Sequence, residues 1–304
     1  MLPFRTICGL PLVVACLGAS CETAHQDSSQ QFAAPALIAH RGGTADRPEN
    51  TMVAIRAALG QRVKLIWLSV QLSAEGEPVL YRPAELSALS RLNAGWNFAE
   101  ASADGEKRFP YRNHPVGIPA LRDALREIPD SVSVVLNMKA MPAEAQTTAV
   151  ARVLESANAW GRVLIYSTEA DYQRTFAAWP KARLFESRDA TRNRLVAATL
   201  GQQCQTPPVS GAWAGFELRR KVDVVETFTL GEGRSPVNAV FWTRASVDCY
   251  RSRAPVSLVA FGVNDRAAYC DAKRLGLDFV MVDSPEKMAG IRAEVEQNPA
   301  LCGN

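Results

Sequence analysis

The segment Ala36-Leu37-Ile38-Ala39-His40-Arg41-Gly42-Gly43 decides how the rest of the chain is interpreted. Its first four residues are apolar, and a short apolar run that stops at polar residues and glycines is typical of a buried strand ending in a loop. Similar runs recur along the chain. The segment therefore predicts the first strand of a parallel sheet, with polar side chains placed where that strand ends.

Seven further apolar runs bounded by turn residues predict strands, and helical patterns lie between them. The runs are Lys64–Val70, Pro78–Tyr81, Val132–Met138, Arg162–Tyr166, Ala182–Phe185, Val256–Phe261 and Asp278–Val282, and the clearest helical patterns are Met52–Leu59, Arg122–Ile128, Ala143–Ala157 and Arg266–Leu275. This alternation predicts an α/β protein with a parallel sheet. Eight strands favour a single-domain (β/α)8 TIM-type barrel over residues 35–304 rather than a doubly wound sheet. Residues 201–242 fit less regularly and predict an extra strand or a capping insertion.

The composition is that of an ordinary soluble globular protein. Charged residues make up 21% of the chain and apolar residues 47%, and 34 basic residues nearly balance 31 acidic ones. The sequence has no long basic run, so we expect no nucleic-acid partner.

The N-terminus has the pattern of a secretory signal peptide. Arg5 precedes the uncharged apolar run Ile7–Leu17, and the small residues Gly18-Ala19-Ser20 come directly before Cys21. Small residues before a cysteine resemble a bacterial lipobox, so residues 1–21 predict a lipoprotein-type signal with Cys21 as the lipidated residue. Cys16 is an alternative lipidation site, and secretion with unmodified cysteines is the alternative to lipidation. Residues 22–34 are largely polar and predict a tether. We expect an exported protein of the bacterial envelope, periplasmic or held to a membrane by a lipid anchor only.

Four cysteines remain after the predicted leader: Cys204, Cys249, Cys270 and Cys302. An even number in an exported protein predicts two disulfides, for which three connectivities are possible. Four buried free thiols are the alternative. A zinc site is less favoured, because no pair has the CxxC spacing and none is near a histidine.

The opening segment also carries a family resemblance. Ala39–Gly43, followed by Pro48-Glu49-Asn50-Thr51, resembles the N-terminal motif of the glycerophosphodiester phosphodiesterase family, and Ile118–Leu121, Val263–Asp265 and Val282–Pro285 resemble later segments of it. The resemblance implies a barrel with its site at the carboxyl ends of the strands. It also implies a divalent metal held by three carboxylates and a pair of acid–base histidines. His40 matches one of these histidines, so His40 and Arg41 are candidate catalytic residues.

The chain departs from the family at the metal ligands. Trp67 and Ser69 align with the two carboxylates of the second strand, and Asn137 aligns with the carboxylate of the fourth. Tryptophan has no oxygen for a hard cation, and serine and asparagine offer only neutral ones. We therefore expect no metal at this site and no other cofactor. Trp67 is expected to fill the vacated space as core rather than to serve as a stacking platform.

The second histidine is also replaced. Arg82 stands at its position and Pro83 at that of the neighbouring aspartate, whereas Lys139 matches a lysine of the family. A cationic pocket formed by His40, Arg41, Arg82 and Lys139 is expected to bind an anion, with Glu49 as an orienting partner. The alternatives are that Arg82 is a solvated surface residue and that His40 serves only hydrogen bonding at its strand end.

Three functional hypotheses follow. The first is a degenerate family member that binds a small anionic or glycerophospho ligand without hydrolysing it. The second is a metal-independent phosphoric diester hydrolase, in which His40 exchanges protons while Arg41, Arg82 and Lys139 stabilise charge. The third is a structural envelope lipoprotein. Hydrolysis of glycerophosphocholine with and without a chelator separates the second from the others.

Overall fold

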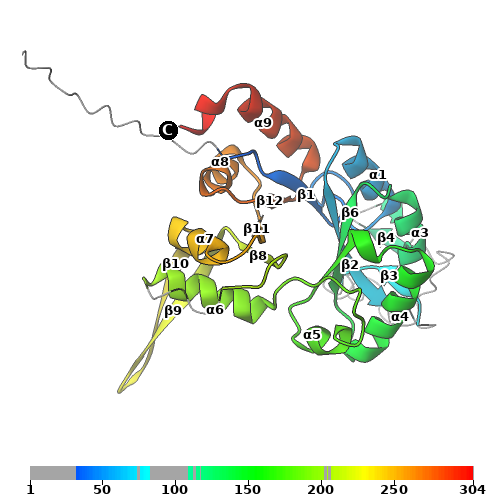
Figure 1. The fold of residues 1–304 in the computed structure, drawn as a ribbon, viewed down its shortest axis with the longest axis horizontal. Helices are drawn as coiled ribbons and strands as arrows, with labels where there is room; N and C mark the ends of the chain where they lie inside the picture. The colour runs from blue at the N-terminus through cyan, green and yellow to red at the C-terminus, as the bar shows by residue number, and fades with distance from the viewer. Residues whose placement is uncertain are drawn as a thin grey trace, which may run out of the picture. The chain divides into compact units, whose positions relative to one another are not determined.

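The chain folds into a (β/α)8 barrel (Figure 1). The computed structural model describes residues 32–73, 76–82, 109–111, 114–116, 118–201, 204 and 207–303, so the predicted leader, most of the tether and Pro83 lie outside the described residues. Seven strands pair in the order β7-β6-β2-β1-β12-β11-β8, each parallel to its neighbours. They are β1 (Ala36–His40), β2 (Leu65–Leu72), β6 (Ser133–Met138), β7 (Val163–Tyr166), β8 (Trp213–Glu217), β11 (Ser257–Phe261) and β12 (Phe279–Val282).

Two residues complete the ring between β7 and β8. Leu184 forms a parallel bridge with Ile165 of β7, and Phe185 forms one with Trp213 of β8. The predicted strand Ala182–Phe185 is therefore reduced to these two residues, which occupy the fifth strand position of the barrel. The barrel predicted from the sequence is confirmed.

One predicted barrel strand is wrong. Pro78–Tyr81 forms β3 (Pro78–Leu80), which pairs antiparallel with β2 and lies outside the ring. The chain reverses through a tight turn, in which the Ser73 amide donates to the Glu77 carbonyl at 2.9 Å, and so short a connection permits only antiparallel pairing. The missing barrel strand is β8, which lies in the stretch whose assignment the sequence left open.

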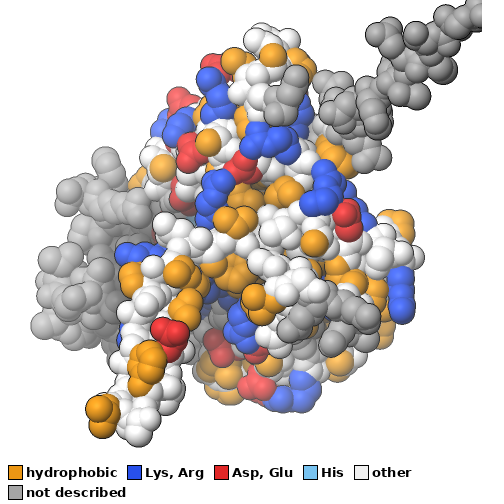
Figure 2. All heavy atoms as spheres, turned by 90° about the vertical axis from the view of Figure 1, so that its left-hand side faces the viewer, with side chains coloured by type: hydrophobic (Ala, Val, Ile, Leu, Met, Phe, Trp, Pro, Cys, Tyr) orange, Lys and Arg blue, Asp and Glu red, His pale blue; other side chains and the backbone are white. Residues whose placement is uncertain are grey.

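The rest of that stretch is a long hairpin, β9 (Arg219–Phe228) and β10 (Gly231–Val240), which projects from the barrel (Figure 1). Nearly all of its residues are exposed. Apolar side chains follow it to the tip (Figure 2), where Leu230 is fully exposed and Phe228 is 59% exposed. The predicted capping insertion is therefore an outward-pointing ribbon.

Helices surround the strands, and their apolar faces pack on the outer side of the barrel sheet. They are α1 (Met52–Gly60), α3 (Leu121–Glu127), α4 (Ala143–Ser156), α5 (Asp171–Phe176), α6 (Arg188–Thr199), α7 (Arg244–Arg251), α8 (Arg266–Leu275) and α9 (Pro285–Gln297), with 3-10 turns η2 (Trp160–Arg162) and η3 (Pro299–Cys302) and a short hairpin of β4 (Phe109–Tyr111) and β5 (His114–Val116). Within the described ranges, none of these helices has both the length and the apolar character of a membrane span.

Two disulfides join the described cysteines, as the sequence predicted. Cys204 pairs with Cys249 and Cys270 with Cys302, which selects one of the three connectivities. The alternatives of free thiols and of a zinc site are therefore wrong. Each bridge closes a loop, of 45 and 32 residues respectively, in the C-terminal third of the chain.

Candidate functional site

His40 ends β1 at the carboxyl rim of the barrel, where Asp283 holds its ring. Nδ1 of His40 lies 2.6 Å from Oδ1 of Asp283, which follows the last residue of β12. Asn264 donates from Nδ2 to the other oxygen of Asp283 at 2.7 Å, and the Asp283 amide donates to Oδ1 of Asn264 at 2.8 Å. The hydrogen bond from His40 is the main reason why the pKa of Asp283 is lowered to about 2. The Asp283 carboxylate, which Asn264 holds in place, therefore orients the imidazole through Nδ1. The other ring nitrogen, Nε2, takes no part in this contact.

The Arg41 side chain contacts the loop that follows β1 through Glu49. Its backbone is left-handed (φ 51°), and its Nη1 donates to Oε2 of Glu49 at 2.6 Å. Both residues are buried, and only 1% of the Glu49 side chain is exposed. Glu49 therefore acts as the orienting partner of Arg41 and does not face the solvent.

Gly42 makes this turn possible. Its φ is +81°, and a Cβ at this position would lie 2.9 Å from the Cβ of Ala54 in α1. A side chain would therefore be strained in conformation and would also collide with the helix. Thr51 caps that helix by accepting a hydrogen bond from the Ala54 amide. The motif around His40 thus packs the first loop tightly against α1.

Trp67 fills the inside of the barrel at the first aligned metal position. It is 2% exposed, and its ring centroid lies 4.8 Å from Tyr166, 5.3 Å from Phe261 and 6.0 Å from Phe185. Gly215 of β8 leaves room for this cluster, because a Cβ there would come within 2.5 Å of the Phe261 ring. The aromatic side chains form an apolar floor beneath the rim of the barrel.

Ser69 and Asn137 lie in register one level above this floor. They are direct partners in the parallel pairing of β2 and β6, and Tyr166 is the partner of Asn137 in β7. Side chains alternate along a strand, so Ser69 faces the same side as Trp67, which is the barrel interior. The asparagine oxygen and the serine hydroxyl are therefore neighbours on the inner wall.

Lys139 follows β6 at the same end of the strands. Burial lowers the pKa of Lys139; of the charges that act on it, the Glu169 carboxylate raises this pKa, and Arg41, Arg82 and Arg188 lower it. Three arginines and one carboxylate therefore lie within electrostatic range of Lys139. Arg82 is partly buried at this rim, so it is not the fully solvated surface residue of the alternative interpretation.

Arg188 is a site residue that the sequence analysis missed. It begins α6, just after Phe185, and its Nη2 donates to both oxygens of Glu217 at 2.7 and 2.9 Å. Its Nη1 donates to the Tyr166 hydroxyl at 3.1 Å. Its position shortly after a strand was a usable signal, since polar residues at such positions face the rim of a barrel.

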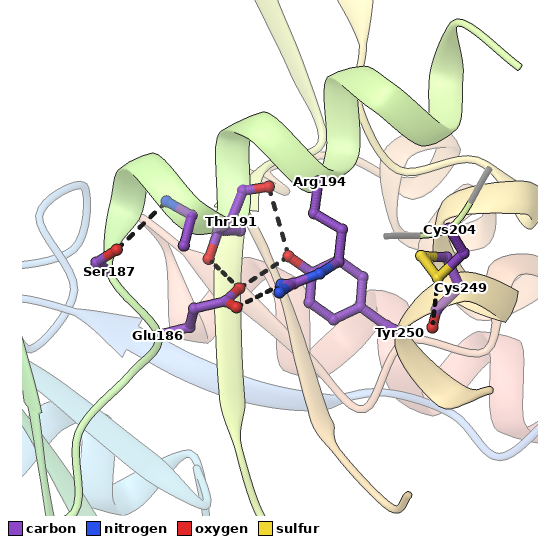
Figure 3. A network of polar contacts seen from close by, with 8 residues as sticks. Glu186, Ser187, Thr191, Arg194, Cys204, Cys249 and Tyr250 are labelled. Carbon is purple, nitrogen blue, oxygen red and sulfur yellow. Dashed lines mark hydrogen bonds and ion pairs between the residues drawn. A yellow bond between two sulfur atoms is a disulfide. The ribbon is translucent and has the colours of Figure 1, made fainter. Parts of the chain in front are cut away.

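A polar network fixes the helix that carries Arg188 (Figure 3). Glu186 accepts hydrogen bonds from the Thr191 hydroxyl at 2.9 Å, from the Tyr250 hydroxyl at 3.0 Å and from Arg194. Tyr250 belongs to α7, so the carboxylate ties α6 to its neighbour. The Cys204–Cys249 disulfide joins the same two parts of the chain.

The comparisons with known proteins agree with this geometry. Residues 40–287 match the Glycerophosphoryl diester phosphodiesterase family. The chain belongs to this family. Rv2277c of Mycobacterium tuberculosis is 42% identical over 289 residues, covering 90% of this chain and 95% of that protein.

Solved structures of phosphodiesterases have the same fold. The glycerophosphoryl diester phosphodiesterase domain of Rv2277c matches with 40% identity and a TM-score of 0.72, covering 86% of this chain and 100% of that one. A phosphodiesterase of Oleispira antarctica, in complex with the product sn-glycerol-3-phosphate, matches with 21% identity and a TM-score of 0.60, covering 84% and 96%. At that identity the second match shows the fold alone.

The residues at the family's metal positions do not fit a divalent ion. Trp67, Ser69 and Asn137 carry no negative charge, and a hard divalent ion is held by anionic and carbonyl oxygen ligands. In the part of the chain that the structure describes, no three His, Cys, Asp or Glu side chains converge in a way that could hold a metal. We therefore derive no catalytic step through a metal.

Proposed function

We propose that this chain is a phosphodiesterase-like barrel that binds a small glycerophospho or related anionic ligand and hydrolyses it poorly or not at all. The observation that carries the proposal is that four basic residues follow strands, Arg41 after β1, Arg82 shortly after β3, Lys139 after β6 and Arg188 at the start of α6, with the three arginines in electrostatic range of Lys139. Cations held this close favour a ligand that brings negative charge, and phosphate is matched by guanidinium groups. Product binding in the Oleispira protein supports the same ligand class.

The electrostatics of Lys139 explain why an anion should bind there. Burial disfavours the charged form of its ammonium group most, and the charges of Arg41, Arg82 and Arg188 disfavour it further, while the Glu169 carboxylate favours it. A phosphate group would reverse that balance, because it supplies the opposite charge at short range. Binding is therefore expected to raise the pKa of Lys139 and to weaken as salt is added.

Calorimetry with sn-glycerol-3-phosphate tests this proposal. We expect Lys139→Met to weaken binding about 10- to 100-fold, the usual contribution of a hydrogen bond to a charged group. Lys181→Met is the matched control, since Lys181 is exposed and pairs with Glu155 on α4 at 2.7 Å. Absence of binding to the wild-type protein at low salt would refute the proposal and leave a structural envelope protein as the remaining hypothesis.

A second candidate function is metal-independent hydrolysis. The His40–Asp283–Asn264 arrangement favours it, because a carboxylate on Nδ1 fixes the tautomer and orientation of an imidazole that must exchange protons through Nε2. In this mechanism a water molecule forms a bond to phosphorus as the bond to the leaving oxygen breaks, His40 gives a proton to that oxygen and is reprotonated by the proton that the water releases, and the surrounding cations stabilise the phosphoryl charge. Turnover of glycerophosphocholine that persists in EDTA and is lost in His40→Ala would establish this function and displace the first.

We also propose that the protein is exported and anchored through a lipid on Cys21. The leader pattern supports this, and so do the two disulfides, which form and persist in oxidising compartments. Expression in a bacterium with labelled fatty acid should label the wild-type chain but not Cys21→Ser. Persistent labelling of Cys21→Ser would move the modification to another residue such as Cys16.

A further inference from the structure

Three buried polar atoms at the barrel rim have no hydrogen-bond partner among the described residues: Nε1 of Trp67, Oγ of Ser69 and Oδ1 of Asn137. Trp67 is 2% exposed and Ser69 is 1% exposed, so bulk water does not reach them. Leaving one such atom without a partner costs about 1–3 kcal/mol, and folded proteins seldom do so. Three in one place indicate a bound group that supplies the partners.

The three side chains share one wall of the barrel. Trp67 and Ser69 are two residues apart on β2 and face inward together, and Ser69 is directly paired with Asn137 on β6. Lys139 lies two residues beyond Asn137, where the strand ends. The unpartnered atoms thus lie on the inner wall of the barrel, below the end of β6 that Lys139 follows.

The chemistry of these atoms selects the charge of the bound group. The indole N–H is only a donor and a serine hydroxyl can donate as well, whereas the unpartnered atom of Asn137 is its amide oxygen, which accepts. None of the three groups is negative. An oxygen of an anion would therefore receive hydrogen bonds from Trp67 and Ser69, and the Asn137 oxygen would accept one from a hydroxyl of the same ligand.

We infer that Trp67, Ser69 and Asn137 form an uncharged hydrogen-bonding subsite for a phosphomonoester or phosphodiester, in which Trp67 and Ser69 donate to one phosphoryl oxygen and the Asn137 oxygen accepts from a ligand hydroxyl. This inference rests on the proposed function and assigns the deepest contacts of the same ligand. Lys139, which follows β6 at the end of the same strand, faces a remaining phosphoryl oxygen. Trp67 and Ser69, which stand at the positions of metal-ligating carboxylates in the family, would instead donate hydrogen bonds directly to the phosphate.

Two conservative substitutions test the subsite. Trp67→Phe removes the indole N–H but keeps an aromatic ring on the floor, and Ser69→Ala removes only the hydroxyl. Each should weaken sn-glycerol-3-phosphate binding about 10-fold by calorimetry, because each deletes one hydrogen bond to a charged group. Trp160→Phe and Ser156→Ala are the controls, since their polar atoms bond to Glu155 and to the Val153 carbonyl, away from the barrel interior.

A spectroscopic measurement supports the same test without relying on affinity. The indole N–H resonance that is absent from Trp67→Phe identifies Trp67, and it should shift when the wild-type protein is titrated with sn-glycerol-3-phosphate. The Trp160 indole, which is already bonded to Glu155 at 2.6 Å, should stay in place.

The outcomes separate this inference from the proposed function. Wild-type binding with unchanged affinity in both variants, or with no movement of the Trp67 resonance, would overturn the subsite and leave its polar atoms to trapped water. Wild-type protein that binds no phosphate ligand would overturn the proposed function, and the subsite with it. A 10-fold loss confined to Trp67→Phe and Ser69→Ala would establish the subsite.

Discussion

Replacing Trp67 with alanine should destabilise the whole barrel, and the magnitude follows from its contacts. Its side chain is almost fully buried among Tyr166, Phe185 and Phe261. Truncating a buried aromatic residue to alanine costs about 3–5 kcal/mol in free energy of unfolding. Deleting the unpartnered Nε1 returns about 1 kcal/mol or more of that cost. We therefore expect a net loss of about 2–4 kcal/mol.

Urea unfolding followed by circular dichroism, with the disulfides intact, measures this loss. Trp67→Phe should change the free energy of unfolding by only about 1 kcal/mol, because the ring contacts are largely kept and the orphaned donor is removed. A double-mutant cycle of Trp67→Ala with Phe261→Ala should give a coupling of about 0.5–1.5 kcal/mol. A Trp67→Ala protein within about 0.5 kcal/mol of wild type would show that the indole does not support the barrel floor.

Three further predictions concern the framework of the site. Asp283→Asn should be less stable than the wild-type protein at neutral pH but not in acid. The pKa of Asp283 is about 2 in the folded state, below the ordinary 3.8, so its ionised carboxylate stabilises the fold above pH 3.8 and this stabilisation is lost as the pH falls through 2. A loss of stability that does not change with pH would contradict this prediction. Glu49→Ala should lower the free energy of unfolding by about 3–5 kcal/mol, since it leaves Arg41 buried without its carboxylate; a loss below about 1 kcal/mol in urea unfolding would argue against a buried ion pair. Replacing Cys204 and Cys249 by serine should cost about 2–4 kcal/mol, measured likewise, and an unchanged midpoint would mean that the bridge constrains nothing.

Most of the barrel was readable from the sequence because its buried strands are short, apolar and regularly spaced. The eighth strand was not. β8 contains Gly215, which has little strand propensity but is required by the aromatic rings that press against it. Pro78–Leu80 was wrongly predicted to be a barrel strand because its apolar pattern is that of such a strand. Only the tight turn before it dictates the antiparallel pairing with β2.

The candidate site was likewise predictable from the sequence only in part. The motif around His40 marked the rim, and Trp67 and Ser69, which are two residues apart on β2, lie on one face of that strand. Arg188 escaped notice because its partner Glu217 is 29 residues away, and only the closed ring brings the two together. Asp283 lies 243 residues from His40, so no local pattern could pair them.

The aromatic floor also bears on how a metal-binding carboxylate could be introduced into this barrel. Trp67→Glu alone would open a cavity and place a charge among Tyr166, Phe185 and Phe261, so that step would be strongly destabilising. Single changes at Ser69 or Asn137 would supply one carboxylate each, too few to hold an ion. Building a metal site here one substitution at a time therefore begins with a step that is strongly destabilising or with one that leaves the ligand set incomplete, and the packing around Trp67 opposes the first of these.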